Sequence, residues 1–220
     1  LFLNAAAHIQ HHYMFNAKIY SGPFSNPAWY VNATADPVLD VYTLYDRIVG
    51  QVQAIFPAAR LMLATGLHQD PHKELTFYWR LKNHADFLKQ ARIDFDRVEP
   101  RMSRDFVIYC STPEQASLAE YQLKQVRSVD GTELFDIDNR GDSLFVMLTW
   151  AHDITDAFVY HVGSERKRNL RDQVAFVAIK NGAHNGVGYL IDTGDGAVRA
   201  KTIPLSSLPQ RVATACGVSW

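Results

Sequence analysis

Short apolar runs and one long helical stripe dominate the pattern of hydrophobic and polar positions. Leu1–Leu3, Leu61–Thr65 and Val174–Ile179 are runs in which most residues are apolar. Runs of this kind, bounded by turn residues, are typical of strands buried on both faces of a sheet. Between the first two runs, residues 38–55 repeat apolar positions at i, i+3 and i+4 after Asp36-Pro37. This pattern predicts a helix that begins with Asp36 as N-cap and Pro37 as its first residue.

The order strand, loop, helix, strand favours an α/β fold. We expect a mostly parallel sheet flanked by helices, with right-handed crossovers between its strands. The pattern changes in the middle of the chain, where a strand at 105–110 precedes a helix opened by Thr112-Pro113. Gln115 completes a capping box there, and the runs 134–137 and 143–149 flank a turn, as in a hairpin.

These boundaries predict two parts. Residues 1–98 and 151–220 form the α/β core, and residues 99–150 form an inserted β-α-β-β subdomain. Since the first residue is Leu rather than Met and the first residues lack the pattern of a signal peptide, we expect the natural polypeptide to begin upstream.

The amino-acid composition excludes only a few classes of protein. Of the 220 residues, 47% are apolar and 20% are charged, as in an ordinary globular protein. The net charge of -1 indicates neither nucleic acid nor an acidic membrane as partner. No apolar run approaches the length of a membrane span. Two isolated cysteines, Cys110 and Cys216, are too few for a disulfide framework and do not indicate a compartment.

Three of the predicted strands lead into loops that carry histidine, at His8, His68 and His184. In open α/β sheets, ligands bind beyond the carboxyl ends of the strands, so parallel neighbours would bring these loops together. Imidazole is a common ligand of zinc and similar ions. The sequence therefore predicts a site for zinc or a similar ion, with Asn4 and Asp70 as further ligands. His11 and His12 are expected in supporting or surface positions.

A second polar group lies beside the predicted subdomain. Arg101 and Arg104 precede its first strand, and Tyr78-Trp79 lies shortly upstream. Arginine binds phosphate or carboxylate through paired hydrogen bonds, and a neighbouring aromatic ring stacks on a base or sugar. These four residues are candidates for substrate binding. The alternative is an Arg–Asp surface network that only holds the loop in place.

The motifs resemble those of the alkaline phosphatase superfamily, in its phosphodiesterase, nucleotide pyrophosphatase and sulfatase branches. His184 followed by Gly188–Gly196, and Ile203–Gly217 with Pro209 and Thr214, resemble the end of that family's sequence. Asn4-Ala-Ala-Ala-His8 stands where the family has Asp-x-x-x-His. Thr65-Gly66-Leu67-His68 stands where it has Ser-Asp-His-Gly.

This resemblance implies a metal-dependent hydrolase of phosphate diesters, phosphate monoesters or sulfate esters, with one or two divalent ions, zinc or manganese. Its substrate would be a small molecule or a glycan or nucleotide ester. The nucleophile would lie upstream of Leu1. Asn4 and Leu67 stand at positions that hold aspartate in the family. The alternative is therefore a non-catalytic relative that binds a phosphorylated or sulfated ligand or a partner protein.

Overall fold

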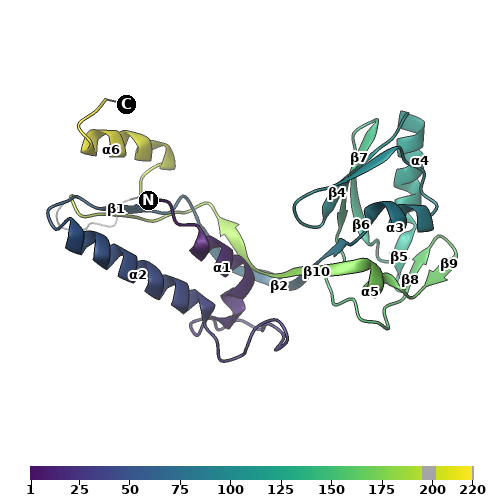
Figure 1. The fold of residues 1–220 in the computed structure, drawn as a ribbon, viewed down its shortest axis with the longest axis horizontal. Coiled ribbons are helices and arrows are strands. Elements are labelled where there is room, and N and C mark those ends of the chain that lie inside the picture. The colour runs from purple at the N-terminus through teal and green to yellow at the C-terminus, as the bar shows by residue number, and fades with distance from the viewer. Residues whose placement is uncertain (195–201, 220) are drawn as a thin grey trace. The chain divides into compact units, whose positions relative to one another are not determined.

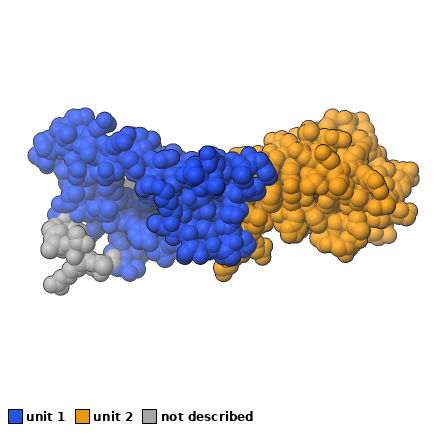
Figure 2. Space-filling view, turned by 90° about the horizontal axis from the view of Figure 1, so that it is seen from below, with its two compact units in different colours: residues 1–72, 181–220 blue, residues 73–180 orange. Residues whose placement is uncertain are grey.

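The computed structural model describes residues 1–194 and 202–219. The chain forms two compact units, unit 1 with residues 1–72 and 181–220 and unit 2 with residues 73–180 (Figure 2). The strands β2 (His68–Leu81) and β10 (Val174–Asn185) pair with each other. Each of them contributes residues to both units. The predicted insertion at 99–150 lies within unit 2.

Unit 2 is built on a four-stranded sheet. Its strands are β3 (Arg97–Pro100), β4 (Asp105–Tyr109), β6 (Phe135–Asn139) and β7 (Ser143–Leu148), in the order β3-β4-β7-β6, and every pair is antiparallel. Buried positions alternate along β7, and three consecutive residues of β4, Phe106, Val107 and Ile108, are buried. The helices α3 (His84–Gln90) and α4 (Pro113–Lys124) contact this sheet. The fully buried side chains of this core include Leu88, Phe106, Ile108, Leu123, Phe135, Leu144 and Leu148.

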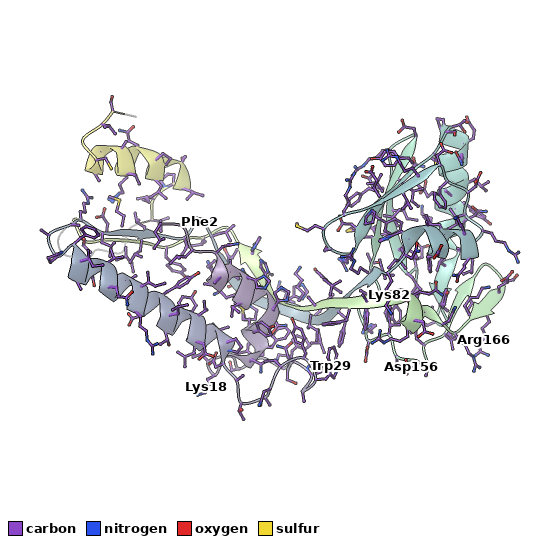
Figure 3. The ribbon with its side chains drawn as sticks, viewed as in Figure 1. Phe2, Lys18, Trp29, Lys82, Asp156 and Arg166 are labelled. Atoms are coloured by element: carbon purple, nitrogen blue, oxygen red, sulfur yellow. The ribbon has the colours of Figure 1, made fainter. Side chains whose placement is uncertain are left out.

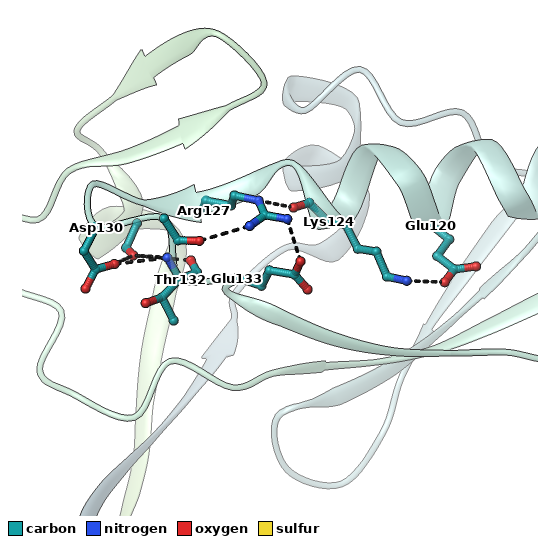
Figure 4. A network of polar contacts seen from close by, with 8 residues as sticks. Glu120, Lys124, Arg127, Asp130, Thr132 and Glu133 are labelled. Carbon is teal, nitrogen blue, oxygen red and sulfur yellow. Dashed lines mark hydrogen bonds and ion pairs between the residues drawn. The ribbon is translucent and has the colours of Figure 1, made fainter.

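The helix α4 begins and ends at specific polar contacts. Thr112 Oγ1 accepts a hydrogen bond from the Gln115 N–H at 3.2 Å, and Gln115 Oε1 accepts one from the Ser111 N–H at 2.6 Å. At the other end, Lys124 pairs with Glu120 at 2.7 Å one turn earlier. Figure 4 shows how the network continues through Arg127, which donates to the Lys124 carbonyl at 2.8 Å.

Arg127 also joins the end of α4 to a neighbouring turn. Its guanidinium pairs with Glu133 at 2.6 Å and donates to the Gly131 carbonyl at 3.1 Å. Gly131 has a φ of 89°, a conformation that favours glycine. Arg127 lies in β5 (Val126–Ser128), which pairs with β8 (Tyr160–Val162), and β8 pairs with β9 (Glu165–Lys167). The short helix α5 (Leu170–Gln173) leads directly into β10.

Unit 1 is mainly helical. It contains α1 (Ala5–Tyr13), the 3₁₀ turn η1 (Met14–Asn16), α2 (Pro37–Ile55), β1 (Met62–Ala64), β11 (Leu190–Asp192), the 3₁₀ turn η2 (Leu205–Ser207) and α6 (Leu208–Ala215) (Figure 1). Asp36 caps α2 by accepting a hydrogen bond from the Leu39 N–H at 2.9 Å. The helices α1 and α2 contact each other, with Val41 buried and the Tyr45 hydroxyl accepting a hydrogen bond from the Ala6 N–H at 3.0 Å.

A buried asparagine ties α1 and η1 to β10. The Asn181 side chain accepts hydrogen bonds from the Phe15 N–H at 2.9 Å and from the Asn26 amide at 2.7 Å. Asn181 is fully buried, so these bonds satisfy a polar group that would otherwise be costly to remove from water. The part of β10 that belongs to unit 1 is thus held at its first residue, Asn181, against η1.

The prediction of a mostly parallel sheet flanked by helices is wrong. All the sheets whose register is described are antiparallel, and they contain two to four strands. Leu1–Leu3 is no strand but exposed chain that leads into α1, and Phe2 lies at the surface (Figure 3). The run 61–65 forms only the three-residue strand β1, which pairs antiparallel with β11. An apolar run indicates burial but specifies neither the partner nor the direction of a strand.

Several local predictions are confirmed. The helix that begins at Asp36-Pro37, the Thr112 cap and the hairpin of β6 and β7 all form, and Gly141 in the hairpin turn has a φ of 96°. Each of these depends on residues close together in the sequence. Among the described residues, no helix is long and apolar enough to cross a membrane.

Candidate histidine site

The helix α1 presents three imidazoles. His8, His11 and His12 stand at i, i+3 and i+4, which is the spacing that brings side chains to one side of a helix. The run of alanine before them favours helix, and histidine in the last turn suits the negative end of the helix dipole. The side chain that the helix places toward β10 is His11.

His11 meets His184, near the end of β10, across 173 positions of sequence. Their Nε2 atoms lie 2.8 Å apart, and their ring centroids are separated by 4.6 Å. The other His11 nitrogen, Nδ1, lies 3.3 Å from the Gly182 carbonyl oxygen. A carbonyl oxygen only accepts, so a neutral His11 donates from Nδ1 and leaves the lone pair of Nε2 directed at His184. The pair is exposed.

His8 and His12 extend this group along α1. Their ring centroids are 4.5 Å apart, and His12 Nδ1 lies 3.0 Å from the Tyr30 hydroxyl. Burial lowers the pKa of His12, and the neighbouring His8 and His11 lower it further. The neutral form of this imidazole is therefore favoured. Tyr30 is itself in contact with Tyr13 and Trp29, at centroid distances of 5.5 and 6.1 Å.

A close approach of three backbone segments holds His11 beside His184. A side chain added at Gly182 would place its Cβ 2.2 Å from Gln69 Oε1 and 2.8 Å from the Gln10 carbonyl oxygen. Gln69 is buried and donates from its amide to the Ala7 carbonyl at 2.9 Å. Because only glycine leaves room here, α1 lies directly against β10 and β2 at the level of His11.

His68 forms a second polar group, at the start of β2. Its Nδ1 lies 2.7 Å from the Val187 carbonyl oxygen and its Nε2 lies 3.1 Å from Asp70 Oδ1. The other Asp70 oxygen accepts a hydrogen bond from the Asn185 amide at 2.8 Å. Both ring nitrogens face acceptors, so the imidazole is arranged to donate twice. The group joins the start of β2 to the loop that follows β10.

The predicted substrate residues all lie in unit 2. Trp79 is buried, and its indole N–H donates to the His152 carbonyl at 2.9 Å. The Arg104 guanidinium lies 4.1 Å from the centre of the Tyr78 ring, and Arg101 pairs with Glu99 at 3.4 Å. A role of these side chains in substrate binding stays a prediction.

The structure brings together only part of the predicted metal site. His184 contacts His11 rather than His8, and His68 contacts Asp70. Asn4 stands at the N-cap of α1 without a side-chain cap bond. Within the described residues, no group of three or more histidine, cysteine or acidic side chains is arranged to hold a metal ion. His11, expected from the sequence in a supporting or surface position, is the histidine of α1 that contacts His184, and its i+3 spacing from His8 follows from the helix.

Comparisons with known proteins identify no family for this chain. No protein-family model, no curated protein and no solved structure matches this chain. Asp195 and Gly196, which belong to the resemblance noted in the sequence, lie outside the described residues.

Proposed function

We propose that unit 1 binds a divalent transition-metal ion, zinc or manganese, through His11 and His184, and that the protein hydrolyses a phosphate or sulfate ester. The observation that carries the proposal is the 2.8 Å separation of the two Nε2 atoms. One of the two nitrogens donates to the other in the metal-free protein, and loss of that proton would leave two imidazole nitrogens of the kind that zinc binds.

The pair fits such an ion with a small adjustment. Zinc binds imidazole nitrogen at about 2.0–2.1 Å, so two nitrogens of a tetrahedral set lie roughly 3.3 Å apart. The rings of His11 and His184 would have to separate by about half an ångström. His184 is exposed and His11 is half-buried, so the His184 side has room for that movement and for ligands other than the protein.

A backbone carbonyl beside His11 orients the pair for metal binding. The Gly182 carbonyl, which accepts from His11 Nδ1, orients the ring and selects the tautomer in which the lone pair, the metal-binding group of imidazole, is on Nε2. When bound, such an ion supplies a polarised water and stabilises charge on an ester oxygen. The resemblance to metal-dependent phosphodiesterases and sulfatases supports ester hydrolysis as the reaction.

Zinc binding is the first measurement. Purified chain, freed of metal and titrated with zinc by calorimetry, is expected to bind zinc, and His11→Ala or His184→Ala should lower the affinity on the order of tenfold or more. His161→Ala, in β8 of unit 2, is the matched control and should bind zinc like the wild type. Equal affinity in all four proteins would exclude the His11–His184 site.

Turnover is the second measurement. Nitrophenyl esters of three kinds, a phosphodiester, a phosphomonoester and a sulfate, are incubated with the chain and added zinc or manganese. Hydrolysis of one of them that is lost in His11→Ala supports the proposal. Zinc binding with thermal stabilisation by phosphate or sulfate, but no turnover of any ester, would show a binding protein instead of a hydrolase.

A further inference from the structure

The last part of β10 carries two Asn-Gly pairs, Asn181-Gly182 and Asn185-Gly186. Asparagine before glycine is prone to spontaneous deamidation, because glycine has no Cβ to hinder its own backbone nitrogen. In this reaction the glycine nitrogen bonds to Cγ of the asparagine and ammonia leaves. Water then opens the cyclic imide to aspartate or isoaspartate. The surroundings of the two pairs differ, and these surroundings determine which asparagine can react.

Burial and hydrogen bonds protect Asn181. Its side chain is fully buried and accepts hydrogen bonds from the Phe15 N–H and the Asn26 amide. Its own amide donates to Asn26 Oδ1 at 2.9 Å. Gly182 is buried as well. The Asn181 side chain cannot turn toward the Gly182 nitrogen without leaving buried polar groups without partners, and that loss is costly.

The second pair lies in open surroundings. Asn185 is the last residue of β10, and Gly186 is exposed in the loop that follows. A Cβ added at Gly186 would meet nothing within 4 Å. The side chain and backbone of Asn185 can therefore reach the geometry of ring closure without displacing neighbouring groups.

The Asn185 side chain already points along the backbone that would attack it. Its Oδ1 accepts a hydrogen bond from the Val187 N–H at 3.1 Å. This is an Asx turn, which folds the side-chain amide over the following peptide and thus toward the Gly186 nitrogen. During the attack, negative charge develops on Oδ1. The Val187 N–H is placed to stabilise that charge.

The contact that holds the Asn185 amide nitrogen lies at the surface. This nitrogen donates to Asp70 Oδ2 at 2.8 Å, and the Asp70 side chain is 57% exposed. A hydrogen bond at the surface has a small net stability, because water replaces either partner. The bond to Asp70 therefore restrains Asn185 much less than the buried bonds restrain Asn181.

We propose that Asn185 is a site of spontaneous deamidation, and that this modification releases the end of β10 from the start of β2. In the product, a carboxylate replaces the amide that donated to Asp70, so two negative groups face each other. Isoaspartate also lengthens the backbone before Gly186 by a methylene group. It thereby shifts Val187, whose carbonyl oxygen lies 2.7 Å from His68 Nδ1. This proposal does not depend on the metal site or on ester hydrolysis.

The first experiment measures deamidation in the folded full chain. The chain is incubated at mildly alkaline pH and digested at acidic pH, where deamidation is slow. Mass spectrometry then reads residues 181 and 185 separately, and an isoaspartyl methyltransferase quantifies isoaspartate. Aspartate and isoaspartate should accumulate at residue 185, whereas Asn181 should stay intact. In the same chain unfolded in urea, both asparagines should react.

Two outcomes of this experiment would overturn the proposal. In the first, residue 185 stays intact in the folded chain over the time in which it reacts in urea. In the second, both asparagines react equally in the folded chain, which would show that the reaction passes through the unfolded state.

The variant Gly186→Ala tests the attacking nitrogen. The added methyl group meets no neighbour, so the fold is preserved, but it hinders the nitrogen, and deamidation at residue 185 should slow on the order of tenfold or more. Gly50→Ala adds the same group within α2 and should leave that rate unchanged. Equal rates in Gly186→Ala and the wild type would rule out the proposed reaction.

The variant Asn185→Asp tests the structural consequence, because it reproduces one product. Amide exchange of residues 185–190 should accelerate on the order of tenfold, since repulsion replaces the bond to Asp70. Adding Asp70→Asn to this variant should restore slow exchange, because the new amide can donate to the carboxylate at position 185. Unchanged exchange in Asn185→Asp, or no recovery in the double variant, would overturn the release of β10 from β2.

Discussion

Replacing Gly182 by alanine is expected to separate α1 from β10. The new Cβ would lie 2.2 Å from Gln69 Oε1 and 2.8 Å from the Gln10 carbonyl oxygen. The flexible Gln69 side chain can move only by giving up its hydrogen bond to the Ala7 carbonyl. The Gln10 carbonyl belongs to the α1 backbone, so its movement shifts the helix turn that carries His11.

The loss of stability in α1 can be estimated from these two contacts. Loss of the hydrogen bond from Gln69 costs about 1 kcal/mol, and an overpacked methyl group costs about 1–3 kcal/mol. Together, about 2–4 kcal/mol should be lost from the local stability of α1. Amide exchange in α1 should then accelerate on the order of 30- to 1,000-fold. Zinc affinity should fall on the order of 10- to 100-fold, because the Gly182 carbonyl no longer orients His11.

Hydrogen-exchange mass spectrometry of the α1 peptide, with an α4 peptide of unit 2 as internal reference, measures the first effect, and zinc calorimetry measures the second. The matched control is Gly50→Ala, because Gly50 lies within α2 with nothing within 4 Å of its added Cβ. Alanine should stabilise that helix by about 0.5–1 kcal/mol. Unchanged α1 exchange and unchanged zinc affinity in Gly182→Ala would refute the assigned packing of His11.

Three further predictions concern unit 2. Phe106→Ala should lower the free energy of unfolding by about 3–5 kcal/mol, because Phe106 is fully buried, whereas Tyr121→Ala at the exposed face of α4 should change it by less than about 0.5 kcal/mol in urea unfolding. Burial, and secondarily Arg80, lowers the pKa of His84, so the unfolded state takes up a proton first as the pH falls. Stability should therefore decrease below about pH 6.5. His84→Gln should flatten this dependence of the urea midpoint, and an unchanged slope would contradict it. Thr112→Ala should cost about 1 kcal/mol by removing the cap of α4, and an unchanged urea midpoint would argue against the cap.

Short-range structure could be read from the sequence in this protein. Asp36-Pro37, Thr112 with Gln115, and the turn at Gly141 each act through residues within a few positions of one another, so their side chains and backbone preferences decide the outcome locally. The histidine-rich segment also forms locally, since His8, His11 and His12 all lie within α1. Its internal geometry depends only on the helical spacing of α1.

Strand partners and the contact of His11 with His184 could not be read in the same way. The two imidazoles are 173 positions apart, and their contact requires that Gly182, Gln69 and Gln10 pack closely enough to bring α1 onto β10. The apolar runs likewise indicate burial but not the direction of a strand. The antiparallel pairing of β1 with β11 is visible only in the structure, where Arg60, just before β1, also binds Asp192 of β11. The sequence by itself determined caps, turns and helix faces, because these depend on neighbouring residues. Tertiary packing decided which strands pair and which histidines meet, because those contacts join distant segments.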